Sequence, residues 1–159
     1  MTETKYFIVE AKVDGINSIS WNQEIEQERK SAVFDLLNNG KFKLYNKNKT
    51  GPYKINIKLL EWKLILSVVD LFDDSMAEIK VSISSVRRII RDYQIVCDNY
   101  VEAIKTAPLK KIEAIDIGRR TIHDEGAEML VESFKEKVEL DMDTARRLFT
   151  LVSIISIKI

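Results

Sequence analysis

A run of charged residues in the C-terminal half holds the side chains best suited to chemistry. Residues 115–126 include Asp116, Arg119, Arg120 and His123, the single histidine of the 159-residue chain. At about 100° per residue, a helix through this run places Arg119 inside an apolar stripe and His123 at the edge of that stripe. Because a buried charge costs several kcal/mol unless it is paired, we expect a carboxylate or an anionic ligand beside Arg119.

Arginine doublets occur in each of three C-terminal segments, at 87–88, 119–120 and 146–147. If these segments pack side by side as helices, some guanidinium groups could converge on a phosphate or carboxylate, which their planar fork suits. The alternative is an internal network of ion pairs, because Asp116, Arg120 and Asp124 already have the four-residue helical spacing. This structural alternative is the favoured one. The candidate ligand-binding residues are Arg87, Arg88, Asp116, Arg119, Arg120, His123 and Arg146.

His123 is the candidate catalytic residue, as a general acid or base. Such a histidine needs a carboxylate on its other ring nitrogen, but Asp116 lies two helical turns away and Asp124 points about 100° away from it. The neighbouring Arg119 and Arg120 favour the neutral imidazole. A catalytic role therefore requires a carboxylate from another element, and a histidine hydrogen-bonded at a helix interface is the favoured alternative.

Metal and cofactor chemistry have little support in the sequence. The chain has one histidine and one cysteine, Cys97, and neither stands in a metal-ligand spacing, so we predict no metal site. Phosphate-loop and dinucleotide motifs are also missing from the sequence, so we predict no cofactor. Cys97 falls in an apolar helical stripe, which is typical of a core residue, and a lone cysteine suits a reducing cytosol.

The overall charge argues against binding of nucleic acid or anionic membrane through bulk charge, because 25 basic residues balance 25 acidic ones. A local exception is a lysine-rich segment with interleaved aromatics, which could stack on single-stranded RNA. A solvated lysine face is the favoured alternative. The segment comprises Lys41, Phe42, Lys43, Tyr45, Lys47, Lys49, Tyr53, Lys54 and Lys58.

The hydropathy pattern predicts an α+β fold in a single domain over residues 1–159. Residues 1–83 form a mixed part, with strands at 5–13, 41–45, 53–60, 63–71 and 78–83 and a helix at 20–38. We expect an antiparallel sheet with this helix on one face. Residues 84–159 form a part with three long helices, which begin near Ser84, Pro108 and Asp141 or Asp143. Residues 153–159 could be helix or closing strand.

Two glycines stand within the predicted central helix, at Gly118 and Gly126, and each costs roughly 1 kcal/mol relative to alanine. We expect the close approach of another backbone to compensate for them. The N-terminal residues do not resemble a signal peptide, and the apolar run at 148–159 is too short to span a bilayer. We therefore expect a cytoplasmic location and no membrane partner.

Several motifs in the same order resemble a known family, the bacterial uncharacterised protein family 0262. The resemblance covers about residues 28–151 and implies a family name but no activity. Residues before about Ser20 match weakly, and Asp124 stands where the family pattern often has asparagine. The matching motifs are Glu28-Arg29, Phe34-Asp35-Leu36-Leu37, Gly51-Pro52-Tyr53, Arg87-Arg88-Ile89, Asp92-Tyr93, Cys97-Asp98-Asn99-Tyr100, Glu102-Ala103-Ile104, Ile112-Glu113-Ala114-Ile115-Asp116, Gly118-Arg119-Arg120, His123, Glu125-Gly126 and Asp143-Thr144-Ala145-Arg146-Arg147-Leu148-Phe149-Thr150-Leu151.

Taken together, these residues favour a binding, interaction or regulatory protein over an enzyme. Its site would have Arg119, Arg120 and His123 facing an anionic small molecule or the acidic surface of a protein partner. One alternative is a small enzyme that uses His123 as acid or base, with the two arginines stabilising negative charge. The other is an RNA-binding module built on the lysine-rich segment from Lys41 to Lys58. The oligomeric state is left open.

Overall fold

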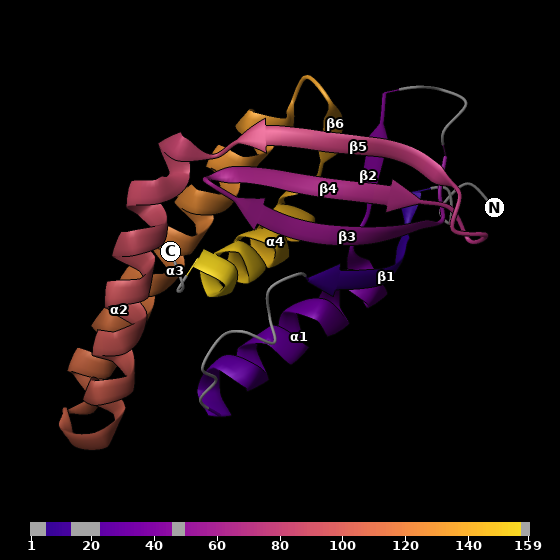
Figure 1. Cartoon of the computed structure of the whole chain (residues 1–159). Coiled ribbons are helices and arrows are strands. Elements are labelled where there is room, and N and C mark those ends of the chain that lie inside the picture. Colours follow the sequence, from indigo (N-terminus) through magenta and orange to yellow (C-terminus); the bar gives the residue numbers. More distant parts are fainter. Residues whose placement is uncertain (1–5, 14–22, 46–49, 157–159) are drawn as a thin grey trace.

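The fold is α+β, as the hydropathy pattern predicts (Figure 1). A computed structural model describes residues 6–13, 23–45 and 50–156. The side chains at 23–25 and 42 are outside this description. The elements in chain order are β1 (Ile8–Val13), α1 (Gln23–Asn39), β2 (Phe42–Leu44), β3 (Tyr53–Leu60), β4 (Lys63–Val69), β5 (Ser75–Ser82), the 3-10 turn η3 (Ser84–Val86), α2 (Arg87–Thr106), α3 (Leu109–Phe134), β6 (Val138–Leu140) and α4 (Met142–Ile155).

The main sheet has four strands in the order β1-β3-β4-β5, and it is mixed rather than wholly antiparallel. The β3–β4 and β4–β5 pairs are antiparallel, whereas β1 runs parallel to β3. The expectation of an antiparallel sheet is therefore wrong for its first strand. Helix α1 follows β1 and carries the chain back across the sheet. After such a crossover the next strand of the sheet, β3, runs parallel to β1.

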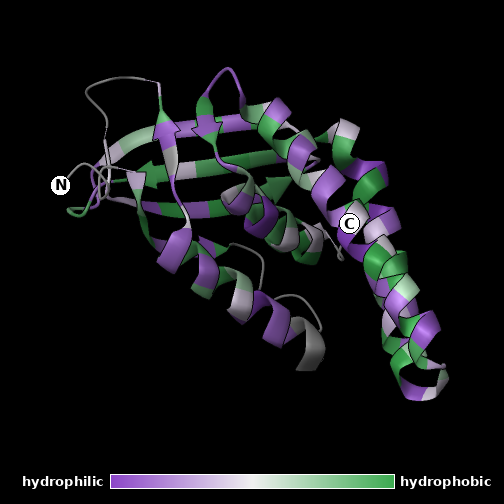
Figure 2. Ribbon diagram, turned by 180° about the vertical axis from the view of Figure 1, so that it is seen from behind, coloured by the Kyte–Doolittle hydropathy of each residue, from purple (hydrophilic) through white to green (hydrophobic). Residues whose placement is uncertain are grey.

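A second sheet pairs two short segments that are far apart in sequence. Strand β2 runs antiparallel to β6, with Phe42 opposite Leu140 and Leu44 opposite Val138. Both views show these strands side by side, crossing the direction of the main strands (Figures 1 and 2). The segment predicted as a strand at 41–45 thus lies outside the main sheet. The sequence does not predict strand β6, because three residues are too few for an alternating pattern to be visible.

The main sheet buries one of its faces, and hydrophobic and hydrophilic residues follow one another along its strands (Figure 2). In β3, Tyr53, Ile55 and Ile57 are buried, while Lys54 and Lys58 point to the opposite face. This alternation is typical of a sheet with one face on the core and one in water. Helices α1 and α4 lie together on one side of the sheet (Figure 1).

The predicted hairpin between β3 and β4 is confirmed, and its turn is Glu61-Trp62. Both residues have positive φ, 49° and 63°. In a two-residue hairpin turn, positive φ at both residues gives the backbone a twist that matches the twist of the flanking strands. The Trp62 carbonyl accepts a hydrogen bond from the backbone N–H of Ile83 at 2.8 Å, which ties the turn to the segment leading into α2.

Helix α4 lies under the sheet and is almost entirely buried (Figure 1). The Asp141 side chain caps its first turn by accepting a hydrogen bond from Thr144 N at 3.1 Å, which confirms one of the two predicted caps. The helix continues to Ile155, so the alternative of a closing strand is wrong for residues 153–155. Residues 157–159 lie outside the described ranges. From Leu148 to Ile155 every residue is buried, so the fold surrounds this part of the helix on all sides.

Helices α2 and α3 form a hairpin that extends beyond the sheet (Figure 1). Gly126 of α3 faces the ring of Phe149 in α4, so the close neighbour is a side chain and not the expected backbone. Around Gly118, apart from its own helix backbone, no described atom lies within 4 Å of the position that a methyl group would take, so the expectation of a close approach is wrong there. In the described part of the chain, none of the helices has an apolar stretch long enough to cross a bilayer.

Candidate functional site

A pocket of about 380 Å³ opens where α2, α3 and α4 meet. Helix α3 contributes four residues within six positions, so their side chains project from neighbouring turns on one side. Helix α4 contributes an arginine doublet and α2 contributes one aromatic ring. Among the described residues, the pocket is lined by Tyr93, Arg119, Arg120, His123, Asp124, Arg146 and Arg147.

Arg119 is the inward-facing charge that the helical pattern predicts, and it is paired. Its Nη2 lies 2.5 Å from Asp116 Oδ1, and its Cζ lies 4.5 Å from the ring centroid of Tyr100. Arg120 bonds the other oxygen of the same carboxylate at 3.1 Å, but its side chain is 69% exposed, against 31% for Arg119. The hydrogen bond from Arg119 holds the pKa of Asp116 below its usual range. The predicted carboxylate beside Arg119 is therefore confirmed.

The arginine doublet of α4 connects three helices. Arg146 bonds Asp124 of α3 at 2.8 Å through Nε and Asp143 of its own helix at 2.7 Å through Nη1. Arg147 bonds Asp35 of α1 at 3.1 Å. Of these three carboxylates, Asp124 lines the pocket, whereas Asp143 and Asp35 do not. Ion pairs of the kind predicted as an alternative thus exist, but among the described residues Asp124 pairs with Arg146 and not with Arg120. The guanidinium groups surround an open space.

His123 and Thr150 are joined by a hydrogen bond whose direction depends on the tautomer of the ring. Its Nε2 lies 2.7 Å from Thr150 Oγ1, and the Thr150 hydroxyl donates to the Arg146 carbonyl at 3.2 Å. A hydroxyl has a single hydrogen, so when Thr150 donates to the Arg146 carbonyl it accepts from His123, and the proton of the neutral ring is then on Nε2. In that tautomer the other ring nitrogen, Nδ1, is a hydrogen-bond acceptor.

The surroundings of His123 keep its ring uncharged at neutral pH. Burial lowers the pKa of His123 to about 4, and the charges of Arg147, Arg119 and Arg146 act in the same direction, against an opposing effect of Asp124. The rings of Tyr93 and Phe149 stand edge-on to the imidazole, with centroids 5.2 and 5.1 Å away. The predicted neutral imidazole is confirmed, with burial as the largest cause.

The environment of His123 does not suit general acid–base catalysis near neutral pH. An effective general base needs a pKa near the working pH and an orienting partner such as a carboxylate. Here the partner on Nε2 is the Thr150 hydroxyl, and a pKa of about 4 leaves the ring a weak base at neutral pH.

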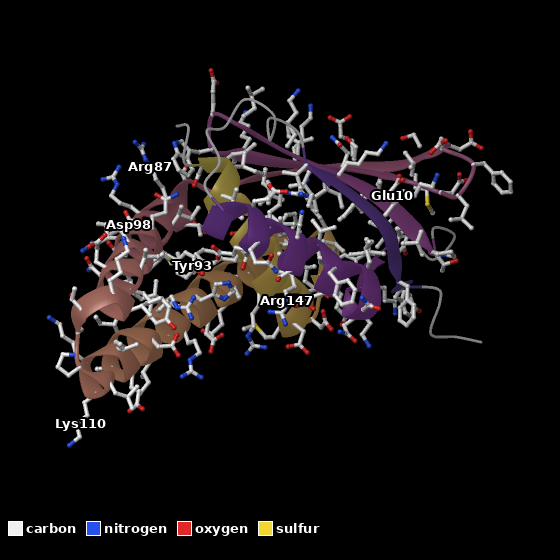
Figure 3. The ribbon with its side chains drawn as sticks, turned by 90° about the horizontal axis from the view of Figure 1, so that it is seen from below. Glu10, Arg87, Tyr93, Asp98, Lys110 and Arg147 are labelled. Carbon is white, nitrogen blue, oxygen red and sulfur yellow. The ribbon has the colours of Figure 1, made fainter. Side chains whose placement is uncertain are left out.

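Arg87 and Arg88 lie outside this pocket. The Arg87 guanidinium stacks over the ring of Trp62, with its Cζ 5.1 Å from the ring centroid, and the Arg88 side chain is exposed. Viewed from below, Arg87 lies near the sheet end of α2, whereas Tyr93 and Arg147 lie toward the middle of the molecule (Figure 3). The structure therefore brings together Asp116, Arg119, Arg120, His123 and Arg146, but not the first arginine doublet.

Sequence reasoning missed Tyr93 and Thr150 as parts of this site. Tyr93 belongs to the apolar stripe of α2, so the pattern indicates a core residue, and it is indeed 4% exposed. Thr150 stands one turn after Arg146 in a largely apolar helical stretch, where a buried hydroxyl needs a hydrogen-bond partner. That position is the signal that could have identified it.

The lysine-rich segment does not form one continuous surface. Lys41 and Lys43 lie beside or in β2, whereas Lys54 and Lys58 belong to β3 of the main sheet. Tyr53, one of the aromatics proposed for base stacking, is fully buried, and Lys54 pairs with Asp73 at 3.1 Å. Lys47 and Lys49 lie outside the described residues. The observed contacts therefore support the solvated lysine face more than an RNA-binding platform.

Comparison with known proteins supports the resemblance seen in the motifs. The model of the uncharacterised protein family UPF0262 matches residues 5–158. A UPF0262 protein of Brucella canis is 43% identical over 132 residues, which is 83% of this chain and 82% of the relative. A UPF0262 protein of Erythrobacter litoralis is 40% identical over 146 residues, which is 89% of this chain and 91% of the relative.

No solved structure matches the chain. The family match spans the residues that build the pocket and the sheet, and it extends further toward both ends than the motifs alone indicate. The chain therefore belongs to the uncharacterised protein family UPF0262, whose matched relatives are bacterial proteins.

Proposed function

We propose that this protein is a cytosolic binding protein whose pocket between α2, α3 and α4 takes a small ligand through a phosphate or carboxylate group. One observation carries the proposal. The pocket wall has four arginines and, among its described residues, a single carboxylate, Asp124. A concave site with several convergent guanidinium groups is well suited to an anion, because the planar fork bonds two oxygens at once.

The arginines around the pocket have more N–H donors than their ion pairs use. A guanidinium group has five N–H donors. Arg120 bonds Asp116 through Nη2, and Arg147 bonds Asp35 through Nε. Even Arg146, which has two carboxylate partners, uses only Nε and Nη1. The remaining donors can bond the oxygens of an anion without any of these pairs being broken.

The pocket's size and its neutral histidine set the kind of anion. A volume of about 380 Å³ lies at the low end of the range of roughly 300–1,000 Å³ seen for small-molecule pockets. With the ring proton on Nε2, Nδ1 of His123 is an acceptor, and it then pairs with a hydroxyl or N–H of the ligand and not with a bare oxygen anion. A small phosphate or carboxylate compound that also has a hydroxyl group meets both conditions.

Replacing Arg120 with alanine tests the proposal. Isothermal titration with inorganic phosphate and with citrate, at constant ionic strength, should detect binding to the unchanged protein. Loss of a hydrogen bond to a charged group costs roughly 1.5–3 kcal/mol, so Arg120→Ala should weaken binding by about tenfold to a hundredfold. Arg120 is exposed, and in the described ranges its ion pair is with Asp116, so its loss should leave the fold intact.

Arg87→Ala is the matched control, because it removes the same charge from an exposed arginine outside the pocket. It should bind both anions with an affinity within about twofold of the unchanged protein. Equal losses in the two variants would mean that net charge alone attracts the anions. That result, or an absence of binding to either anion by the unchanged protein, would refute the proposed site.

A further inference from the structure

A second pocket, of about 280 Å³, lies on the other side of Tyr93, between α1, α2 and α4. Its chemistry is opposite to that of the arginine pocket. Two of its lining residues are acids, and none of the described ones is a lysine, arginine or histidine. The lining residues are Glu28, Tyr93, Gln94, Cys97, Asp98, Ser153 and Ile154. Figure 3 labels Tyr93 and Asp98, which both belong to α2.

The Ser153 hydroxyl is a buried polar group for which the described residues offer no hydrogen-bond partner. Ser153 is 4% exposed, and its Oγ is the buried side-chain oxygen that lacks a hydrogen bond within the described part of the chain. Gln94 Nε2 bonds the Ser153 carbonyl at 2.9 Å and Ser156 Oγ at 3.1 Å, which fixes this side of α4 against α2. Buried polar groups are nearly always bonded, so an unmet hydroxyl in a pocket wall indicates a missing partner.

Glu28 is a second notable group in this wall, because it has a hydrogen bond but no ion-pair partner among the described residues. Its Oε1 accepts a hydrogen bond from the Tyr93 hydroxyl at 3.1 Å, and among the described residues it has no ion-pair partner. Burial raises the pKa of Glu28, against smaller opposing effects of the Tyr93 bond and of the Arg119 charge. The charge of Arg119 is already paired with Asp116. A carboxyl group in this setting gains most from a cation placed beside it.

The available groups in the pocket are mainly hydrogen-bond acceptors. Both N–H groups of Gln94 are engaged with α4, so the side chain offers the pocket its amide oxygen. Glu28 and Asp98 add carboxylate oxygens, and the Ser153 hydroxyl can also accept. The ring of Tyr93 and the side chain of Ile154 supply apolar surface beside these acceptors. A ligand with several N–H donors, a positive charge and a short apolar body matches this set.

We propose that this second pocket binds a small organic ammonium ion, with its nitrogen between the Glu28 carboxylate and the Ser153 hydroxyl and its carbon chain along Tyr93 and Ile154. The volume suits a ligand of a few carbons, such as a short alkylamine. This inference does not depend on the anion site, because apart from Tyr93 the two pockets share no described lining residue.

Titration of the whole protein with n-butylamine and putrescine tests this proposal, with n-butanol and butyrate as size-matched neutral and anionic compounds. Thermal unfolding at constant ionic strength should show stabilisation by the two amines only, because a ligand of the folded state raises the melting temperature. In the same titrations, NMR should show the side-chain amide signal of Gln94 shifting with amine concentration. Stabilisation of equal size by butanol would overturn the assignment of a cation site.

Two substitutions identify the groups that bind the nitrogen. Glu28→Gln keeps an acceptor for the Tyr93 hydroxyl but removes the charge, and it should weaken amine binding at least tenfold. Ser153→Ala should weaken it several-fold while leaving the fold intact, since the hydroxyl has no partner to lose among the described residues. Glu113→Gln, a change of an exposed acid outside the pocket, is the matched control and should have no effect. Wild-type affinity in Glu28→Gln would refute the proposal.

Arg120→Ala separates this proposal from the anion site. That variant should retain amine binding at the wild-type level even though its phosphate and citrate binding falls. Amine binding that disappears together with anion binding would mean that there is a single site, which contradicts the assignment of a second pocket. If the unchanged protein binds anions but no amine, this inference alone is wrong.

Discussion

Gly126→Ala is expected to destabilise the protein by about 1–3 kcal/mol, the usual cost of forcing extra volume into a packed core. The added methyl group would overlap the ring of Phe149, within 2.6 Å of its Cδ1 and closer still to Cε1 and Cζ. That ring is fully buried and stands against both Tyr93 and His123. It therefore has no free space to move into, and any shift of the ring disturbs the wall of the arginine pocket.

Gly118→Ala provides a control in the same helix. Among the described residues, no atom outside the helix backbone lies within 4 Å of the corresponding methyl position, so the substitution should stabilise the protein by up to about 1 kcal/mol through helix propensity alone. Urea unfolding of the two variants and of the unchanged protein measures both effects. Stabilisation of similar size in both variants would show that Phe149 does not fill the space beside Gly126.

Acid should destabilise the protein through His123. Burial holds the pKa of His123 at about 4 in the folded protein, below its ordinary value of 6.5. The unfolded chain therefore binds a proton near pH 6.5, whereas the folded protein resists protonation until about pH 4. Stability from this group is complete above about pH 6.5 and is lost as the pH falls from there toward about 4. The loss between about pH 7 and about pH 4.5 should be about 2–3 kcal/mol.

The variant His123→Gln isolates this contribution, because glutamine has no charge to gain and can still bond Thr150. Urea unfolding at about pH 7 and at about pH 4.5 gives the difference in unfolding free energy between the unchanged protein and the variant. Most of the change caused by protonation of His123 falls between these two pH values. Groups with other shifts, such as Glu28, whose pKa is raised, and Asp116, whose pKa is lowered, cancel in this difference. A difference that stays constant with pH would show that His123 titrates alike in the folded and unfolded states.

The local elements of this protein follow from short-range patterns. The alternation in residues 53–60 predicts β3 with the bounds that the structure has, because the side-chain period of a strand is visible within eight residues. The change to a 3.6-residue period after Ser84 predicts α2 and α3 in the same way, and Asp141 marks the start of α4. The inward direction of Arg119 is equally a property of helical spacing. The need for a partner follows from the cost of a buried charge.

Pairing between distant segments is decided only by the tertiary structure. The parallel register of β1 on β3 depends on where α1 carries the chain, and the pairing of β2 with β6 joins segments from opposite halves of the chain. Neither is encoded in a local period. Residue type alone assigned Arg87 and Arg88 to the site, but Trp62 in the hairpin turn engages the first of them at the end of α2 near the sheet.

The composition of the two pockets is likewise a tertiary property. Tyr93 has the pattern of a core residue, and only the crossing of α2 with α4 makes it a wall shared by an arginine-lined and an acid-lined pocket. By itself the sequence determined which helices and most of the strands form, the family, and the charges on α3, because these depend on neighbours within one or two turns or on motifs read in order. The packing of α4 against α1, α2 and α3 decided which charges meet, because their separation in the chain says nothing about their separation in space.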